Sequence, residues 1–394
     1  MKRIVALVVV ISIFFCFRIN SFAESKEKSE AEYASLSSCY DFDLEYDLGG
    51  AYLCEATTGK VLYAENEFKA ASPASVTKIM TLLLVCEAID SGRIGLGDVV
   101  TVSQKAASMG GSQVFLEEGE RITVEELIKS TVIASGNDAS VALAELCAGS
   151  EAAFVKQMNS RAIELGLKNT HFENTTGLDD TTTNHYSCAA DIAKMSRELI
   201  KHEIILKYAS IWQDTIRNGE FTLTNTNRLV RYYDGCNGLK TGSTDKAGYC
   251  ISATAKRGNM QLVAVIMGAK TKDERNAAAK SLLDFGFANF ALYEVGEKYI
   301  ENIPVRSGKV DSLALYSEPF SIVVGKSDIN KICLIYEIPD FASAPIIKGS
   351  EMGKIKYLIG DEQIGQSQIY AECDVLKINF GGILFRILKR IING

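Results

Sequence analysis

The sequence predicts an α/β protein of the α+β kind: a catalytic domain containing a helical subdomain, then a small all-β domain and a C-terminal amphipathic helix. Strand-like segments flank a long run of helix-like segments, and near residue 296 the pattern changes to short strands. The last residues repeat apolar side chains at helical spacing. A chain of 394 residues also exceeds what one hydrophobic core usually serves, so two domains are expected.

The first 23 residues have the composition of an export signal. Lys2 and Arg3 precede the apolar run Ile4–Phe17, and Ser21-Phe22-Ala23 has a small-x-small cleavage pattern. A membrane-spanning helix needs about 20 apolar residues, so this run is short for a permanent anchor. An uncleaved N-terminal anchor is the alternative, and under both interpretations the remaining chain is exported.

Residues 24–44 are predicted to form a flexible lead-in, and the catalytic domain is expected over residues 45–292. Ala51–Cys54 and Val61–Ala64 predict its first two strands because a Thr-Gly turn separates them. After them, Pro73-Ala74-Ser75 opens a helix whose body is apolar nearly all round, as expected at the centre of a domain. Further helices are predicted over Val124–Ile133, Ala139–Cys147, Ala152–Leu165 and Ala189–His202.

Two strands return late in this domain. Tyr249–Ala255 and Met260–Met267 are joined by Lys256-Arg257-Gly258-Asn259, which predicts a hairpin. Strands on both sides of a helical run suggest a mixed sheet, with the helical subdomain inserted between its edges.

Residues 296–378 are predicted to form the small β domain, with strands at Phe320–Val324 and Ile332–Ile338. Residues 381–394 then form a basic amphipathic helix. Its apolar residues fall at 383, 384, 387, 388 and 391, whereas Arg386, Lys389 and Arg390 share the opposite face. Such a helix suits a membrane interface, and packing on the β domain is the alternative.

The chain contains ten cysteines, of which nine remain if Cys16 leaves with the signal. An odd number at irregular positions favours free thiols over a disulfide framework. Apolar neighbours predict that five of them are buried: Cys54, Cys86, Cys147, Cys250 and Cys333.

Three short motifs point to an active-site serine. They are Ser75-Val76-Thr77-Lys78, Ser135-Gly136-Asn137 and Lys240-Thr241-Gly242. Two further S-x-x-K matches, at Ser25 and Ser243, lie in polar stretches, so only Ser75 begins a buried helix. There the i, i+3 spacing brings Lys78 to the same face, one turn away.

The chemistry explains these residue types. A serine hydroxyl needs a nearby base, and Lys78 serves only when neutral, so burial and the charge of Lys240 must lower its pKa. Ser135 can pass a proton to the leaving amine, while Asn137 can hold Lys78 and the substrate amide. We therefore predict Ser75, Lys78 and Ser135 as the catalytic residues.

The strand at Lys240-Thr241-Gly242 is predicted to bind substrate. It offers a cation and a hydroxyl to a terminal carboxylate, and its edge can pair with an extended peptide. Gly242 permits close backbone approach. The backbone N–H groups of Ser75 and Ser243 would form the oxyanion hole, so Asn137, Lys240, Thr241, Gly242 and Ser243 make up the predicted binding set.

These motifs resemble those of the low-molecular-mass penicillin-binding proteins, specifically the serine-type D-alanyl-D-alanine carboxypeptidases. The likeness covers roughly residues 45–292 and includes Gly111–Leu116, Thr176–Asp179 and Tyr233–Thr244. It is weaker over the β domain and the terminal helix.

The resemblance implies a β-lactamase/transpeptidase-like catalytic domain. It implies that Ser75 attacks the bond between the two terminal D-alanines of a peptidoglycan stem peptide, releases one, and is acylated by β-lactam antibiotics. The location implied is the outer face of the cytoplasmic membrane, facing the cell wall, with the terminal helix on that membrane.

Three alternatives use similar residues. A class A β-lactamase needs a deacylating glutamate in E-x-x-L-N, and no glutamate between Ser135 and Lys240 has that context. A D,D-endopeptidase acting on cross-links differs only in its leaving group. A β-lactam sensor or wall-binding module shares the fold without the reaction.

Other classes of function fit poorly. The net charge of -7 argues against nucleic acid as a partner. The three histidines His171, His185 and His202 lack the spacing of zinc ligands, so no metal or cofactor is predicted, and His185 is expected to be structural.

Overall fold

The computed structural model describes residues 42–180 and 182–393. The predicted signal segment, residues 1–23, and most of the lead-in lie outside these residues. The chain divides between Gly286 and Phe287 into two compact units, which we call the first and the second unit.

A five-stranded sheet forms the centre of the first unit, in the order β2-β1-β9-β8-β7. Its strands are β1 (Gly50–Glu55), β2 (Val61–Glu65), β7 (Cys236–Thr244), β8 (Gly248–Arg257) and β9 (Met260–Ala269). All four pairings are antiparallel, so the prediction of a mixed sheet is wrong. Short turns join β1 to β2 and β7 through β9, which forces antiparallel neighbours, and β9 then pairs antiparallel with β1.

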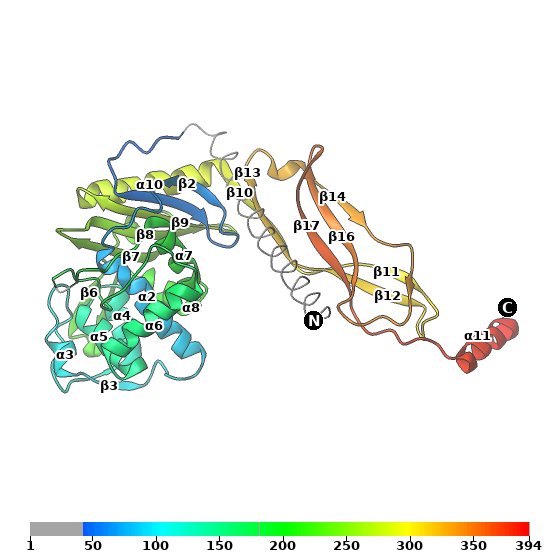
Figure 1. Ribbon diagram of the computed structural model, residues 1–394, viewed down its shortest axis with the longest axis horizontal. Coiled ribbons are helices and arrows are strands. Elements are labelled where there is room, and N and C mark those ends of the chain that lie inside the picture. Colours follow the sequence, from blue (N-terminus) through cyan, green and yellow to red (C-terminus); the bar gives the residue numbers. More distant parts are fainter. Residues whose placement is uncertain (1–41, 181, 394) are drawn as a thin grey trace, which may run out of the picture. The chain divides into compact units, whose positions relative to one another are not determined.

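The predicted strand pairs and the insertion of helices between them are confirmed. In sequence, the helical subdomain lies between β2 and β7, which are the two edges of the sheet. Figure 1 shows helix α10 (Lys272–Asn289) along one face of the sheet and the group of helices against the other. Those helices are α2 (Lys78–Asp90), α3 (Gln104–Ala107), α4 (Val124–Val132), α5 (Asn137–Ala148), α6 (Glu151–Glu164), α7 (Ala189–Leu199), α8 (Glu203–Ala209) and α9 (Leu229–Tyr232).

Helix α2 is the core of this subdomain. It is buried on nearly every side, with Ile79, Met80, Leu82 and Leu83 fully inaccessible to solvent. A helix apolar all round is stable only when other elements surround it. Its N-terminus is therefore held rigidly, and this end carries the first motif.

Local sequence signals explain where neighbouring elements begin. Thr123 and Glu126 form a capping box at the start of α4, and the Ser150 side chain caps α6. Two small two-stranded sheets complete the unit: β3 (Val99–Thr101) with β4 (Arg121–Thr123), and β5 (Gln213–Ile216) with β6 (Phe221–Thr224).

The second unit is built from strands. A six-stranded sheet has the order β14-β16-β17-β12-β11-β15, and β10 pairs with β13 beside it. Its strands are β10 (Phe290–Val295), β11 (Lys298–Arg306), β12 (Ser312–Ser317), β13 (Phe320–Gly325), β14 (Ile332–Glu337), β15 (Ala342–Ser343), β16 (Glu351–Ile359) and β17 (Glu362–Ala371). The strands of this unit begin before the predicted boundary at residue 296, with β10. This strand follows α10 directly, so no turn residues mark the boundary in the sequence.

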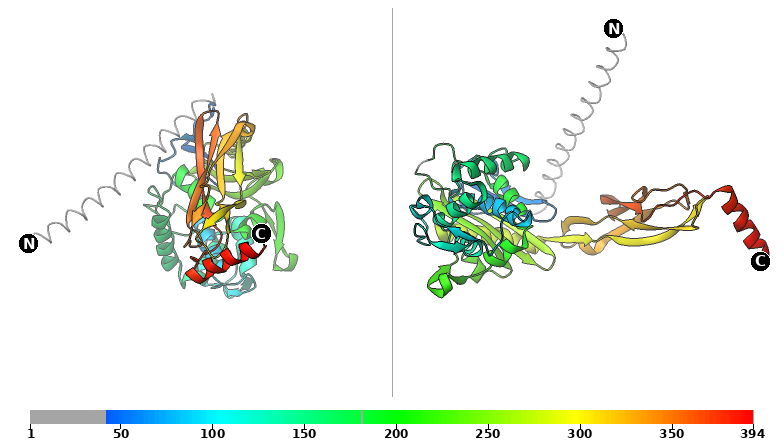
Figure 2. Two further views of the ribbon diagram at one scale, coloured as in Figure 1. Left: turned by 90° about the vertical axis from the view of Figure 1, so that its right-hand side faces the viewer. Right: turned by 90° about the horizontal axis from the view of Figure 1, so that it is seen from below.

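Helix α11 (Phe380–Asn393) ends the second unit, as predicted, and Figure 2 shows it (red) at the C-terminal end of the chain. All five predicted apolar positions, from Ile383 to Ile391, are exposed. Arg386 on the same helix is 2.7 Å from Asp311 Oδ1 and donates to the Lys309 carbonyl at 2.6 Å. Over the part of the chain that the structure describes, no helix has the length and hydropathy required to cross a bilayer.

The eight cysteines within the described residues are free thiols, as predicted. Cys54, Cys86 and Cys250 are buried, and Cys147 is half-buried. The prediction for Cys333 is wrong, because it lies on the exposed side of edge strand β14.

Candidate active site

The nucleophile segment begins as a 3-10 turn, η1 (Ala74–Thr77), and continues into α2. Ser75 lies in the turn, and Lys78 is the first residue of the helix. The i, i+3 spacing places Lys78 Nζ 2.9 Å from Ser75 Oγ.

Lys78 is completely buried and surrounded by oxygen atoms. Its Nζ also contacts Asn137 Oδ1 at 2.6 Å and the Thr176 carbonyl at 2.9 Å. Burial and the charge of Lys240 lower the pKa of Lys78 well below its usual value of 10.5. A neutral amine has two N–H groups and one lone pair; Asn137 Oδ1 and the Thr176 carbonyl accept the two hydrogens. The lone pair is then left for the Ser75 hydroxyl, the arrangement of a general base.

The second motif contacts the first through Asn137 and the third through Ser135. Ser135 adopts a left-handed backbone conformation, with φ of 65°, just before α5 begins at Asn137. Asn137 Nδ2 donates to the Gly110 carbonyl at 2.6 Å, which orients its Oδ1 toward Lys78. One N–H of this amide therefore serves the protein, and one is left for a substrate carbonyl.

Lys240 on edge strand β7 links the third motif to the second. Its Nζ donates to Ser135 Oγ and to the Thr241 carbonyl, both at 2.8 Å. Burial, and the nearby charge of Arg275, lower the pKa of Lys240 to about 7. A cation that is buried without a carboxylate partner is costly unless a ligand supplies the anion.

Two glycines allow backbone segments to meet at the nucleophile. A Cβ on Gly242 would lie 2.7 Å from Ser75 N and 2.9 Å from Val76 N, so only glycine lets β7 approach the turn. Gly177, with φ of +80°, would place a Cβ 1.8 Å from the Ala74 carbonyl oxygen. The close approach of β7 brings the Ser243 backbone beside Ser75, where the sequence predicts the oxyanion hole.

His185 holds the nucleophile segment in place through hydrogen bonds. Its Nδ1 accepts a hydrogen bond from the Glu173 N–H at 3.1 Å, and its Nε2 lies 2.8 Å from Thr77 Oγ1. Burial lowers the pKa of His185 to about 4, so the ring is neutral and donates to Thr77. Both ring nitrogens are thus used in holding the fold.

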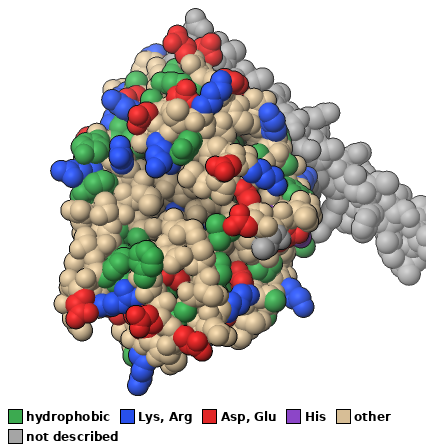
Figure 3. Space-filling view, turned by 90° about the vertical axis from the view of Figure 1, so that its left-hand side faces the viewer, with side chains coloured by type: hydrophobic (Ala, Val, Ile, Leu, Met, Phe, Trp, Pro, Cys, Tyr) green, Lys and Arg blue, Asp and Glu red, His purple; other side chains and the backbone are tan. Residues whose placement is uncertain are grey.

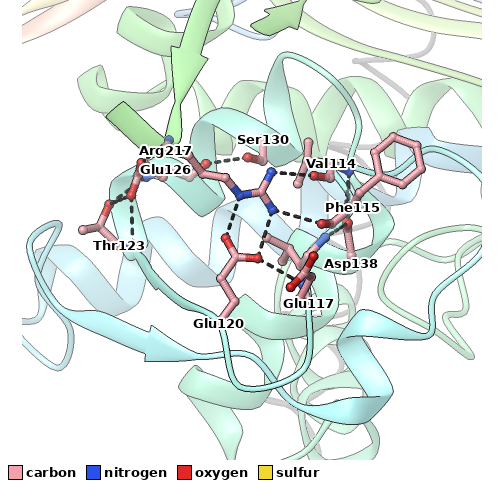
Figure 4. Close-up of polar contacts among 10 residues, drawn as sticks. Val114, Phe115, Glu117, Glu120, Thr123, Glu126, Ser130, Asp138 and Arg217 are labelled. Atoms are coloured by element: carbon pink, nitrogen blue, oxygen red, sulfur yellow. Dashed lines mark hydrogen bonds and ion pairs between the residues drawn. The ribbon is translucent and has the colours of Figure 1, made fainter. Parts of the chain in front are cut away.

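A clamp centred on Arg217 holds the loop beside the second motif (Figure 4). Its guanidinium lies 2.7 Å from Glu120 Oε1 and donates to the carbonyls of Val114 and Phe115 at 2.9 and 3.0 Å. From the other side, the buried Asp138 carboxylate accepts the Val114 N–H at 3.0 Å. Because Asp138 follows Asn137 directly in α5, the clamp ties the loop to the residue that orients Lys78.

A cleft of about 660 Å³ opens above these residues. Figure 3 looks onto this side of the first unit and shows a hollow in the middle of the face, with Lys and Arg side chains along its upper edge. Predicted site residues that line the cleft are Ser75, Ser135, Thr241, Gly242 and Ser243. The structure therefore brings all three motifs together, with Lys78, Asn137 and Lys240 bonded directly behind them.

Arg275 lines the same cleft and was not predicted. It is only 4% exposed, and its guanidinium bonds to Asn276 Oδ1 at 2.9 and 3.1 Å. Burial lowers its pKa to about 10. Helical spacing could have revealed it, because Arg275 shares the buried face of α10 with Ala278, Ala279 and Leu282.

Comparison with known protein families matches residues 42–271 to the D-alanyl-D-alanine carboxypeptidase family. Residues 287–377 match the C-terminal domain of penicillin-binding protein 5. The chain is 42% identical over 395 residues to the D-alanyl-D-alanine carboxypeptidase DacF of Bacillus subtilis, and the alignment covers 98% of each protein.

Two solved structures extend the comparison. Penicillin-binding protein 5 from Haemophilus influenzae is similar with a TM-score of 0.75 at 32% identity, over 86% of this chain and 100% of that one. Penicillin-binding protein D2 from Listeria monocytogenes, in its ampicillin-bound form, is similar with a TM-score of 0.58 at 30% identity. That second similarity covers 62% of this chain and 100% of the other.

Proposed function

The chain belongs to the serine-type D-alanyl-D-alanine carboxypeptidases, and we propose that it removes the terminal D-alanine of peptidoglycan stem peptides through an acyl-enzyme on Ser75. One observation carries this proposal above the others. The buried Lys78 amine lies 2.9 Å from Ser75 Oγ, with its other contacts taken by obligate acceptors. Such an amine is a base directed at one hydroxyl.

In the acylation step, Lys78 takes the Ser75 proton while Oγ attacks the carbonyl carbon of the penultimate D-alanine. The backbone N–H groups of Ser75 and Ser243 stabilise the oxyanion that forms. Ser135 passes a proton to the leaving nitrogen, the C–N bond breaks, and D-alanine departs. Water then attacks the Ser75 ester, with Lys78 again as the base, and the shortened peptide leaves with a new carboxylate.

The terminal carboxylate of the substrate is expected beside Thr241, Lys240 and Arg275. Thr241 Oγ1 lies 2.8 Å from Thr226 Oγ1, and both residues line the cleft. This hydrogen bond holds the Thr241 hydroxyl at the cleft wall. Arg275 supplies a buried guanidinium, and the described residues place no carboxylate within ion-pair distance of it. An anionic ligand relieves the repulsion among these cations, which favours substrates with a free C-terminus.

Penicillins are expected to acylate the same serine and to remain bound. The Listeria relative in its ampicillin-bound form supports this expectation. Labelling of Ser75 by a fluorescent penicillin therefore provides a test of a folded site that does not depend on turnover.

Export and membrane attachment are part of the proposal. The composition of residues 1–23 supports export to the outer face of the cytoplasmic membrane. The exposed apolar positions of α11 support attachment there. Co-sedimentation with vesicles containing anionic lipid tests the second point. Ile387→Asn should reduce the bound fraction and Ile347→Asn, at an exposed site in a strand-rich region, should not; equal binding of both variants contradicts attachment through α11.

The activity is tested by D-alanine release from a short peptide that ends in Lys-D-Ala-D-Ala. The full chain is expected to release D-alanine, Ser75→Ala to release none, and the exposed control Ser108→Ala to match the parent. A folded protein that is labelled by penicillin at Ser75 but releases no D-alanine would overturn the carboxypeptidase assignment.

A further inference from the structure

A second pocket in the first unit lies away from the Ser75 cleft, and we call it the α7 pocket. It has a volume of about 460 Å³ and shares no lining residue with the cleft. Strand β1, helix α7 and residues 166–169, which follow α6, contribute most of its walls. This volume falls within the range of small-molecule sites, about 300–1,000 Å³. The reaction at Ser75 uses none of these residues, so a ligand here would be separate from the peptide in the cleft.

The α7 pocket has an excess of positive charge. Lys168, Lys194 and Arg197 line it, against the single lining carboxylate of Asp191. The Oδ2 atom of that carboxylate already accepts two hydrogen bonds at 2.8 Å, from the Asn169 N–H and from the hydroxyl of the next residue. Among the described residues, no carboxylate lies within ion-pair distance of the three cations. Cations gathered in a pocket without free anions favour a negatively charged ligand.

The Arg197 side chain is held in place before any ligand binds. Its Nε donates to the Ala56 carbonyl at 2.8 Å, and its Nη2 donates to the Thr57 carbonyl at 3.3 Å. A Cβ on Gly59, where φ is +76°, would lie 2.2 Å from Arg197 Nη1, so only glycine leaves room for the guanidinium. Nη1 itself has no hydrogen-bond partner in the part of the chain that the structure describes. Its N–H groups are therefore available to an anion at little cost in side-chain entropy.

The remaining walls combine aromatic rings with an amide. Phe68, which is 62% exposed, and Tyr52 contribute the rings. Ala190 and Ala193, one turn apart on α7, have side chains too small to fill the space beside them. The side-chain amide of Asn169 has no hydrogen-bond partner among the described residues, and it can both donate and accept. A sugar ring suits these walls, because its C–H groups can pack on aromatic faces while its hydroxyl groups bond to an amide.

We propose that the α7 pocket binds an acidic sugar, a ring that carries a carboxylate or a phosphate group. The anion lies against Arg197 and Lys194, the ring packs on Phe68, and the hydroxyl groups bond to Asn169. The proposal concerns binding alone and does not depend on the reaction at Ser75. The two kinds of anion correspond to two sources, the carboxylate-bearing sugar of peptidoglycan and the sugars of phosphate-bearing polymers.

The test measures dissociation constants by titration calorimetry with the full chain. The probes are N-acetylmuramic acid, N-acetylglucosamine 6-phosphate, neutral N-acetylglucosamine and inorganic phosphate. At least one acidic sugar is expected to bind about tenfold or more tightly than both the neutral sugar and inorganic phosphate, and the tighter of the two identifies the source. Equal affinity for the neutral sugar or for inorganic phosphate, or no binding of either acidic sugar, would overturn the inference.

Charge reversal identifies the cations responsible. Lys168→Glu and Lys194→Glu should each weaken binding of the preferred acidic sugar by about tenfold. The matched control is Lys280→Glu, at an exposed position of α10 on the other face of the sheet, and it should bind as the parent does. A cooperative thermal transition close to that of the parent verifies that each variant is folded. Binding that survives both reversals contradicts the assignment to the α7 pocket.

The aromatic wall is tested by truncation. Phe68→Ala should weaken binding of the acidic sugar and leave the affinity for inorganic phosphate unchanged, because the ring contacts the sugar and not the anion. Ile347→Ala, at an exposed apolar position of the second unit, is the matched control. An unchanged affinity of Phe68→Ala for the acidic sugar would contradict a sugar ring on this wall.

Blocking the cleft separates this inference from the proposed function. Protein acylated at Ser75 by penicillin should bind the acidic sugar with the dissociation constant of the parent. Loss of binding on acylation would place the sugar in the Ser75 cleft and overturn the inference. A protein that binds acidic sugars but releases no D-alanine would contradict the carboxypeptidase assignment and leave the α7 pocket standing.

Discussion

Two arginines in the first unit show opposite ways of placing a cation. Arg217 makes a two-point contact with Glu120 and donates to two loop carbonyls, and the Glu120 carboxylate raises its pKa. Arg275 is more deeply buried, has the amide oxygen of Asn276 as its one hydrogen-bond partner among the described residues, and has a lowered pKa. The first has protein groups for all its contacts, whereas the second faces the cleft.

The difference separates structural charges from functional ones. A cation matched by a carboxylate and carbonyls contributes to the fold, since removing it leaves buried acceptors without donors. A cation buried beside other cations destabilises the fold and is useful only to a ligand. Lys240 and Arg275 belong to the second group, and together with burial the charge of Lys240 keeps Lys78 neutral as the base. The following variants test whether the division holds.

The largest effect is expected at Lys78. Replacing it with methionine keeps the volume but removes the base, so acylation of Ser75 should slow by at least about 10³-fold. The rate of labelling by fluorescent penicillin measures this step directly. Lys280→Met is the matched control, and near-normal labelling of Lys78→Met would exclude Lys78 as the base.

At Arg275, activity and stability should separate. Arg275→Met is expected to lower kcat/KM for D-alanine release by about 100-fold, because a charged hydrogen bond to the substrate carboxylate is lost. The melting temperature should stay the same or rise, because a buried charge without a carboxylate partner becomes apolar. A large fall in melting temperature would place Arg275 with the structural charges.

Arg217→Met, unlike Arg275→Met, should lower the stability of the protein. Glu120 and two backbone carbonyls lose their donors at a partly exposed site, so the free energy of unfolding should fall by about 2 kcal/mol. Urea unfolding measures it, and a double-mutant cycle with Glu120→Gln isolates the pair. Unchanged stability would show that the clamp contributes nothing to the fold.

The smallest expected effect is the change of unfolding free energy with pH. The pKa of Lys240, about 7 in the folded protein, lies below its usual value of 10.5, so between these values the unfolded chain binds more protons. Stability from this group therefore increases as pH rises from 7 to 8.5, by at most about 1.4 kcal/mol per pH unit. Lys240→Met should lack this increase, which urea unfolding at several pH values will show. Parallel plots of unfolding free energy against pH for the parent and Lys240→Met would contradict the lowered pKa of Lys240.

Sequence patterns predicted the elements better than their arrangement. Helical and strand periodicity located α4 through α7 and the β8–β9 hairpin to within a few residues, because these patterns are local. Strand direction depends on which distant segments pair, and the pairing of β9 with β1 has no local signal. For the same reason, the apolar neighbours of Cys333 did not reveal that its side of β14 faces solvent.

The residues of the candidate site also divide into those that a local motif predicts and those that only the fold brings together. Ser75, Ser135 and Lys240 were found because each begins or occupies a short motif in the right structural context. Arg275 lies 35 residues after Lys240 with no motif around it, so only its place on the buried face of α10 marks it. Trp212, Arg228 and Lys272, which line the same cleft, come from separate segments that meet only in the folded chain.

The left-handed backbone at Ala74 and Ser135, with φ of 47° and 65°, has a consequence for engineering. Such conformations cost non-glycine residues of order 1 kcal/mol or more, and they hold the nucleophile and its proton relay in place. A selection for heat tolerance alone would therefore favour glycine at these two positions. The selected variants would be more stable to heat but would hold the nucleophile less rigidly. A thermostability screen on this enzyme therefore needs turnover as a second criterion.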